Sequence, residues 1–141
     1  MIQLKNYQKN ALAVLTAFLK ESLVSGPVDA FKAESQVKGY PYRDQNFGNT
    51  PFACLRLPTG GGKTLLAAHT VGIAAQHFLC TDSPLVLWLA PTTAIKDQTL
   101  DALQKPWHPY RQALDERFKG QLLILEMDDI TTIRPTDLET K

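Results

Sequence analysis

The chain has 141 residues, which is enough for one ordinary domain and too few for two. With 15 Lys and Arg residues against 14 Asp and Glu residues, the net charge of +1 argues neither for nor against nucleic-acid binding, whereas a strongly basic domain would favour it. The N-terminus lacks the apolar core of a signal peptide and no apolar run could span a bilayer, so we expect a cytoplasmic protein without a membrane partner.

The N-terminal third predicts one helix followed by an irregular connection. Apolar residues at helical spacing indicate an amphipathic helix over Lys5–Val24, which a Ser-Gly-Pro sequence ends. Glycines and prolines then punctuate residues 26–51, where only a short helix near Asp29–Gln36 is expected. We therefore divide this part of the chain into an N-terminal segment, 1–25, and a connection, 26–51.

Residues 52–141 form a third segment, in which short apolar runs alternate with helical patterns. In chain order we expect a strand, a helix, a strand, two helices and a strand at Phe52–Leu57, Lys63–Leu79, Leu85–Ala90, Ala94–Gln104, Tyr110–Phe118 and Gln121–Met127. Apolar strands that alternate with helices predict an α/β fold, in which helices flank a parallel sheet. Cys54 and Cys80 lie in apolar surroundings and show no metal-ligand spacing, which predicts two buried free thiols.

A glycine-rich sequence at Leu57–Thr64 is the sharpest functional signal in the chain. It lies between an expected strand and an expected helix, and its glycines allow backbone amides to approach phosphate oxygens. The unpaired N–H groups and the dipole of the following helix favour the same anion. Lys63 would reach the outer phosphates of a nucleotide, and the hydroxyl of Thr64 would bind its Mg²⁺ ion. The general phosphate-loop pattern begins with glycine but Leu57 stands here, so a simple strand-to-helix turn is the alternative.

Pro58–Thr64 resembles motif I of superfamily 2 helicases and translocases, a group in which the first glycine is often relaxed. The group includes the DEAD/DEAH-box-like proteins and the restriction subunit of type III restriction enzymes. The resemblance implies a partial RecA-like P-loop NTPase domain that binds ATP and Mg²⁺. It also implies that Lys63 is catalytic and that Thr64 is a Mg²⁺ ligand. The residues expected to bind the nucleotide at the loop are Thr59, Gly60, Gly61, Gly62, Lys63 and Thr64.

Two more segments resemble the same family. Leu4–Ala11 is similar to its Tyr-Gln signature, which implies that Gln8 reads the adenine edge with the donor and acceptor of its amide. A plain surface position on the helix is the alternative for this glutamine. The sequence after the second expected strand is similar to motif Ia, which implies that Pro91, Thr92 and Thr93 contact the sugar-phosphate backbone of DNA or RNA. A helix cap is the alternative there, and the two roles do not exclude each other.

The chain lacks a clear motif II, whose Asp-Glu pair would hold Mg²⁺ and orient the attacking water. Leu122–Asp129 is an apolar run with an acidic end, but it carries Glu-Met in place of Asp-Glu. We interpret it as an ordinary sheet strand whose exit turn contains Asp128 and Asp129, with a divergent motif II as the alternative. Arg134, alone in a polar tail, is a poor substitute for the arginines of the family's second motor domain.

These features predict the N-terminal fragment of a first motor domain, unable to hydrolyse ATP by itself. The strand Phe52–Leu57 would lack neighbours, so we expect exposed apolar surface and marginal stability. The parent protein would be an ATP-dependent helicase or translocase, such as that of a restriction enzyme, with DNA or RNA and the remaining motor domains as partners.

Two alternatives stay open. One is another P-loop NTPase, such as a small kinase or a switch GTPase, although the guanine-reading Asn-Lys-x-Asp motif is absent. The other is a non-enzymatic remnant that binds a partner.

Overall fold

A computed structural model describes residues 3–34, 41–42 and 48–132, and the side chains as far as Asp129. In chain order these residues form α1 (Asn6–Ser25), α2 (Pro27–Glu34), α3 (Lys63–Ala74), the π-helix η1 (Ala75–Leu79), α4 (Thr93–Gln104), α5 (Pro109–Phe118) and the 3₁₀-helix η2 (Met127–Thr132). No helix in this part of the chain has the length and apolar character needed to cross a bilayer.

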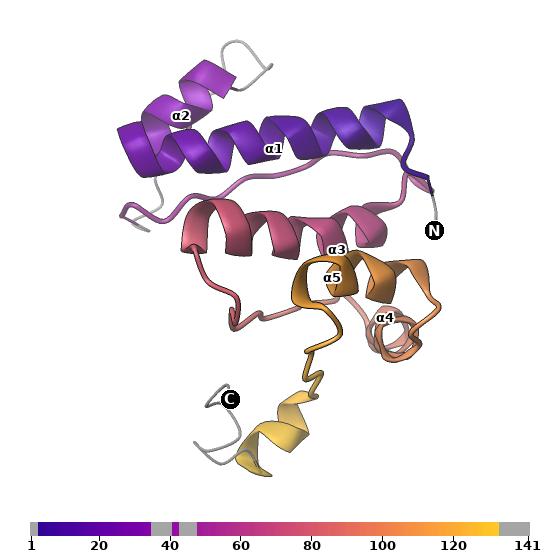
Figure 1. The fold of residues 1–141 in the computed structure, drawn as a ribbon. Helices are drawn as coiled ribbons and strands as arrows, with labels where there is room; N and C mark the ends of the chain where they lie inside the picture. Colours follow the sequence, from indigo (N-terminus) through magenta and orange to yellow (C-terminus); the bar gives the residue numbers. More distant parts are fainter. Residues whose placement is uncertain (1–2, 35–40, 43–47, 133–141) are drawn as a thin grey trace.

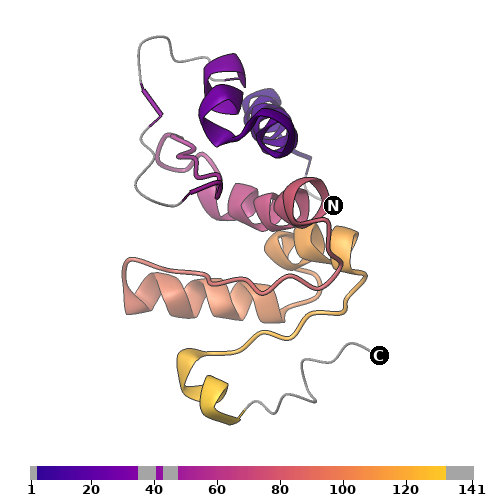
Figure 2. The same cartoon turned by 90° about the vertical axis from the view of Figure 1, so that its left-hand side faces the viewer.

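The helices stack around α3. In Figure 1, α1 and α2 lie on one side of α3, and α5 and α4 lie on the other side. Figure 2 shows the same order after a quarter turn, with η2 beyond α4 at the far end. Residues 48–58 thread between α1 and α3 before the chain enters α3 (Figure 1). The helix that follows the glycine-rich loop is therefore the central element of the fold.

Two clusters of buried side chains hold this stack together. One joins α3 and η1 to α4 and α5, and its buried members are Leu65, Ala68, Ala75, Leu103, Ala113, Leu114 and Phe118. The other joins α1 to α2, and its buried members are Leu15, Phe18, Leu19 and Ala30. Ile73, Ala74 and Phe78 pack against this second cluster. Because α3 and η1 contribute to both clusters, the position of the loop at the start of α3 is fixed from two sides.

The structure confirms the helices expected from the sequence. Those expected at Lys5–Val24, Ala94–Gln104 and Tyr110–Phe118 form as α1, α4 and α5. The helix expected at Lys63–Leu79 forms as α3 and η1, because its last part adopts the wider π-helical hydrogen bonding. The short helix expected near Asp29–Gln36 forms as α2, although its predicted end lies outside the described residues. Helical periodicity and helix end signals depend on residues close in sequence, so they do not require the expected sheet.

The predicted α/β fold class is wrong for the part of the chain that the structure describes. We expected a partial RecA-like P-loop NTPase domain with a parallel sheet and flanking helices, but the described ranges contain no β-strand. The segments expected as strands, Phe52–Leu57, Leu85–Ala90 and Gln121–Met127, are irregular chain, apart from Met127, which begins η2.

The reason for the missing sheet is that these segments do not pair with one another. An apolar composition favours an extended chain against a core, but a strand exists only where its N–H and C=O groups bond to a neighbouring strand. Among the described residues, no backbone hydrogen bond joins one of these segments to another. They lie against helices instead: Leu55 packs on the α1–α2 cluster, and Trp88 and Ile124 pack on the α3–α5 cluster.

Apolar side chains are exposed, but not at the place where we expected them. We expected this exposure around Phe52–Leu57, whereas many of the large exposed apolar side chains follow Ser83 and Gln121. The exposed leucines of the first of these stretches are Leu85 at 96%, Leu87 at 71% and Leu89 at 80%. Trp88 lies between two of these leucines and packs against the core, whereas Val86 is also exposed.

The predicted burial of both thiols is wrong, since Cys54 and Cys80 are free and exposed. Cys54 lies in the irregular segment beside α1, where no neighbouring strand covers it. Cys80 follows η1 with a φ of 51° and ends that helix through its N–H bond to the Ala75 carbonyl. An apolar neighbourhood in sequence therefore did not translate into a buried position.

Candidate functional site

The glycine-rich loop forms a tight turn that leads into the first turn of α3. The Gly61 N–H donates to the Pro58 carbonyl oxygen at 3.0 Å, and Gly62 is the N-cap of α3 with a φ of 79°. Gly60 has a φ of 74°, so both residues adopt the left-handed conformation that glycine reaches at little cost. No described side chain caps this end of α3, which leaves the N–H groups of the first turn for another acceptor.

Two residues at the start of α1 bind the carbonyl group of Gly61. The Tyr7 hydroxyl donates to the Gly61 oxygen at 3.1 Å, and Gln8 Nε2 donates to the same oxygen at 3.0 Å. Gln8 is buried, and its Oε1 accepts a hydrogen bond from the Lys5 N–H at 2.9 Å. The amide that we expected to read adenine therefore already uses its oxygen and one N–H within the protein. A base contact would fall to its second N–H or to the second lone pair of its oxygen.

Close contacts, one with α1 and one within the loop, also explain why residues 61 and 62 are glycines. A Cβ on Gly62 would lie 2.5 Å from Gln8 Nε2, and a Cβ on Gly61 would lie 2.9 Å from the Pro58 oxygen. Real Cβ atoms do not approach other atoms this closely. The glycine run thus has a packing role in this fold in addition to the phosphate-binding role expected from the sequence.

Lys63 is exposed and folds back over the loop. Its Nζ donates to the Pro58 carbonyl oxygen at 2.9 Å. A single neutral acceptor at the surface holds this ammonium weakly, so an anionic ligand can compete for it. Thr59 is exposed at the turn, and Thr64 is half-buried in the first turn of α3. The structure therefore brings the expected loop residues together around one helix end, with Gln8 beside them.

An apolar groove adjoins this loop. It has a volume of about 670 Å³ and opens between α1 and residues 53–58. Tyr7 and Pro58 line it together with Phe31 of α2. Tyr7 therefore borders the groove with its ring and bonds the loop with its hydroxyl.

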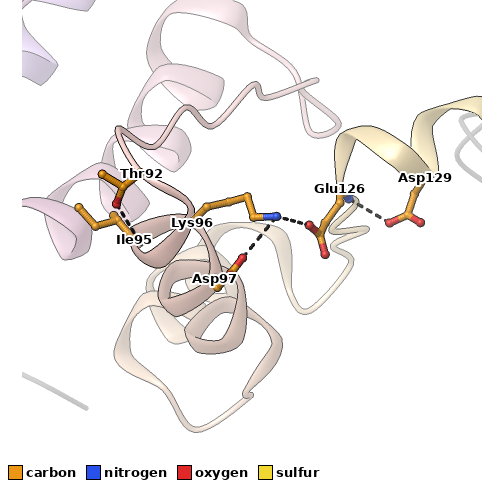
Figure 3. Close-up of polar contacts among 6 residues, drawn as sticks. All are labelled: Thr92, Ile95, Lys96, Asp97, Glu126 and Asp129. Carbon is orange, nitrogen blue, oxygen red and sulfur yellow. Dashed lines mark hydrogen bonds and ion pairs between the residues drawn. The ribbon is translucent and has the colours of Figure 1, made fainter.

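The residues expected to contact nucleic acid lie at the start of α4. Pro91, Thr92 and Thr93 are all exposed there. The Thr92 hydroxyl accepts a hydrogen bond from the Ile95 N–H at 3.3 Å, which makes Thr92 the N-cap of α4 (Figure 3). The capping role that we considered is confirmed, and it leaves the Thr93 hydroxyl and the surface of the first turn facing solvent.

Lys96, for which we predicted no role from the sequence, lies at the same end of α4. Its Nζ is 2.5 Å from a carboxylate oxygen of Glu126 and 3.3 Å from Asp97 Oδ1 (Figure 3). The hydrogen bonds to Glu126 and then to Asp97 raise the pKa of Lys96 above its ordinary value. The sequence could not reveal this pair, because Lys96 and Glu126 are 30 positions apart.

Glu126 and the acidic residues after it do not form the expected strand exit. The Glu126 N–H donates to Asp129 Oδ2 at 3.0 Å, and Asp128 and Asp129 lie in the first turn of η2 (Figure 3). The Glu126 carboxylate, which stands where a motif II carboxylate was considered, is bonded to Lys96 of α4. Within the described ranges, His, Cys, Asp and Glu side chains form no group of three that could hold a metal ion.

Residues 1–134 match the family model described as type III restriction enzyme, res subunit. The match spans both the glycine-rich loop and the start of α4, and it places the chain in the class of helicase-like, ATP-binding proteins. The chain belongs to the family of type III restriction enzyme res subunits, which confirms the family that its motifs resemble. No curated protein and no solved structure matches the chain.

Proposed function

We propose that this chain is the ATP-binding part of a DNA or RNA helicase or translocase, of the kind that serves a restriction enzyme. The observation that carries the proposal is the glycine-rich loop at the uncapped start of α3, with the Lys63 ammonium beside it. Its setting in a helicase-like family supports ATP as the ligand. Unpaired N–H groups, the positive end of a helix and an exposed ammonium together favour a polyphosphate.

The loop supplies the phosphate contacts. The N–H groups of Gly60, of Gly62 and of the first turn of α3 donate to phosphate oxygens, and Thr59 borders them. The Gly61 N–H keeps its bond to the Pro58 carbonyl oxygen. Lys63 exchanges its bond to Pro58 for the outer phosphates, where it stabilises the charge that develops during phosphoryl transfer. Thr64 fits a Mg²⁺ ion, because its hydroxyl lies in the first turn of α3 and phosphate oxygens and water can complete the coordination. The ion neutralises charge on the phosphates when it is bound.

Gln8 is the proposed contact for the adenine base. Its bond to Gly61 holds it beside the loop, so a nucleotide whose phosphates occupy the loop could direct its base toward α1. The remaining N–H of Gln8 would donate to a ring nitrogen of adenine.

The start of α4 is the proposed contact for the nucleic-acid backbone. Pro91, Thr92 and Thr93 are exposed there, and hydroxyl and N–H groups at a helix start bind phosphates without reading sequence. Hydrolysis of ATP needs further carboxylates, which we assign to motif II in the rest of the first motor domain, and arginines, which we assign to the second motor domain. The bond between Glu126 and Lys96 supports this assignment, because that carboxylate is already engaged at α4.

Calorimetric titration of the 141-residue chain with Mg²⁺-ATP tests the proposal. Lys63→Ala is expected to weaken binding by about tenfold or more, because a hydrogen bond to a charged group contributes about 1.5–3 kcal/mol. Lys105→Ala is the control, since it removes an exposed lysine that pairs with Asp101 in α4, and it should leave the affinity unchanged.

The same titrations separate the alternatives. Tighter binding of GTP than of ATP would favour another kind of P-loop NTPase. No binding of ATP by the unmodified chain, or an unchanged affinity after Lys63→Ala, would contradict the proposal and favour a non-enzymatic remnant.

A further inference from the structure

The carbonyl oxygen of Gly61 is fully engaged by α1. The Tyr7 hydroxyl and Gln8 Nε2 donate to it at 3.1 and 3.0 Å, so each of its two lone pairs has a donor. The bond from Gln8 is buried, whereas Tyr7 is partly exposed. Together the two donors fix the direction of this oxygen, which points toward α1.

The direction of this oxygen sets the direction of the next N–H group. The described peptide bonds are all trans, so the Gly61 C=O and the Gly62 N–H point in opposite directions within one plane. Because the oxygen faces α1, the N–H of Gly62 faces away from α1. A phosphate on that side meets a donor, whereas after a flip of the peptide it would meet a carbonyl oxygen and be repelled.

Glycines on both sides of this peptide make such a flip easy unless something prevents it. Glycine populates positive and negative φ about equally well, so the backbone itself imposes little preference. A flip would break the bonds from both Tyr7 and Gln8 and leave the buried Gln8 amide with an unpaired donor, which is unfavourable. The two side chains therefore hold the loop in one orientation before any ligand arrives.

We propose that Tyr7 is a positioning residue of the phosphate-binding loop, which acts with Gln8 by orienting the Gly61–Gly62 peptide whatever base the nucleotide carries. This inference rests on the proposed function of the loop as a phosphate site. This positioning role and a contact with adenine would affect different binding affinities. A contact with adenine changes the affinity for ATP, whereas the orientation of the loop changes the affinity for every ligand with the same phosphates.

The experiment compares Mg²⁺-ATP, Mg²⁺-GTP and Mg²⁺-tripolyphosphate, which has no base, as calorimetric ligands of the 141-residue chain. Tyr7→Phe removes only the hydroxyl and is expected to weaken all three by one common factor, about fivefold for a neutral hydrogen bond. Tyr42→Phe is the matched control. The Tyr42 hydroxyl accepts from the Phe52 N–H at 2.9 Å, so this variant also loses a tyrosine–backbone bond but leaves the loop contacts intact.

The outcomes separate the inference from the proposed function. If the unmodified chain binds the ligands and Tyr7→Phe weakens ATP alone, or none of them, the positioning role is overturned while the phosphate site stands. If the unmodified chain binds neither ATP nor tripolyphosphate, the proposed function fails and the positioning role fails with it.

A second measurement serves if thermal melting shows that Tyr7→Phe does not fold. The amide ¹H–¹⁵N resonance of Gly62 in the unmodified chain is expected to move when tripolyphosphate is added. The resonance of Gly26, which ends α1 and is not part of the loop, is the internal reference. A Gly62 resonance that moves no more than that of Gly26 would overturn the inference.

Discussion

Gly62 is the residue at which backbone conformation and lack of space coincide. Its φ of 79° disfavours any residue with a Cβ, and a Cβ there would lie 2.5 Å from Gln8 Nε2. Gly60 has a similar φ of 74°, but a Cβ at that position would meet no atom within 4 Å. A comparison of substitutions at these two glycines therefore distinguishes the strain of a left-handed backbone from the cost of the contact with Gln8.

Gly62→Ala is expected to destabilise the chain more than Gly60→Ala. Both place a Cβ in the left-handed region, which costs about 1–2 kcal/mol. Only Gly62→Ala also displaces the buried Gln8 amide, which adds about 1–3 kcal/mol once its bonds are lost. Urea denaturation measures both free energies of unfolding. In a Gln8→Ala background the extra loss should vanish, and equal losses for the two alanines in the unmodified background would contradict the close contact.

Among the elements, α4 combines a structural cap with an exposed first turn. Thr92 satisfies the Ile95 N–H, and the same exposed residue is proposed to touch a phosphate backbone. Substitutions that keep the cap but change its charge can therefore distinguish the two roles.

Thr92→Asp is expected to preserve the stability of the chain but to weaken its binding to single-stranded DNA. Aspartate caps a helix at least as well as threonine, whereas Thr92→Ala should lose about 1 kcal/mol of stability. The added negative charge repels phosphate, and the neutral cap in Thr92→Asn should retain both properties. Urea denaturation and fluorescence anisotropy with a labelled oligonucleotide measure the two effects. If Thr92→Asp binds DNA with the same affinity as the unmodified chain, Thr92 serves only as a helix cap.

Glu126→Gln is expected to free Lys96 from its closer ion pair, leaving only that with Asp97, so that Lys96 can contact nucleic acid. One further phosphate contact on a single strand steepens the slope of log affinity against log salt by about 0.7. Asp101→Asn is the matched control, because it frees Lys105 at the opposite end of α4, and its slope should equal that of the unmodified chain. A weaker affinity after Glu126→Gln would instead show that the ion pair orders the nucleic-acid contact.

The pH dependence of this ion pair follows from the raised pKa of Lys96. A group whose pKa is higher in the folded state contributes stability below its unfolded value and loses it as the pH rises through the folded value. The pair should therefore persist up to the ordinary lysine value of 10.5 and be lost only above it. Both side chains are largely exposed, so the effect on the whole fold should be small.

For the whole molecule, the important feature is the row of exposed leucines in the segment before α4. Single exposed apolar side chains are ordinary, but several within one short segment form a patch that favours association. Burial of two such patches against each other would remove them from water. No described segment of the chain pairs through its backbone with the segment that carries these leucines.

The unmodified chain is expected to associate as its concentration rises, and glutamine at positions 85, 87 and 89 should suppress this. The triple substitution should scarcely change stability, because these side chains are mainly in solvent. Val24→Gln, at an exposed apolar residue near the end of α1, is the control and should leave association unchanged. Sedimentation velocity over a range of concentrations measures the effect. A chain that stays monomeric throughout and melts cooperatively would contradict the expectation.

The sequence by itself determined the helices and the place of the glycine-rich loop at the start of one of them. Periodic apolar residues predicted α1, and the step from glycines to Lys63 predicted the start of α3. The threonine cap of α4 could also be read from the sequence. All of these features depend on residues within a few positions of one another, and such interactions leave a pattern in the chain.

Only the tertiary structure decided what lies next to those elements. It replaced the expected sheet with irregular chain against helices in the described part of the molecule, because an apolar run suits either environment. It also brought Tyr7 to the carbonyl of Gly61, 54 positions away, and buried Gln8 against the same loop. Contacts at this separation depend on how all the elements pack together, and no local pattern of residues encodes them.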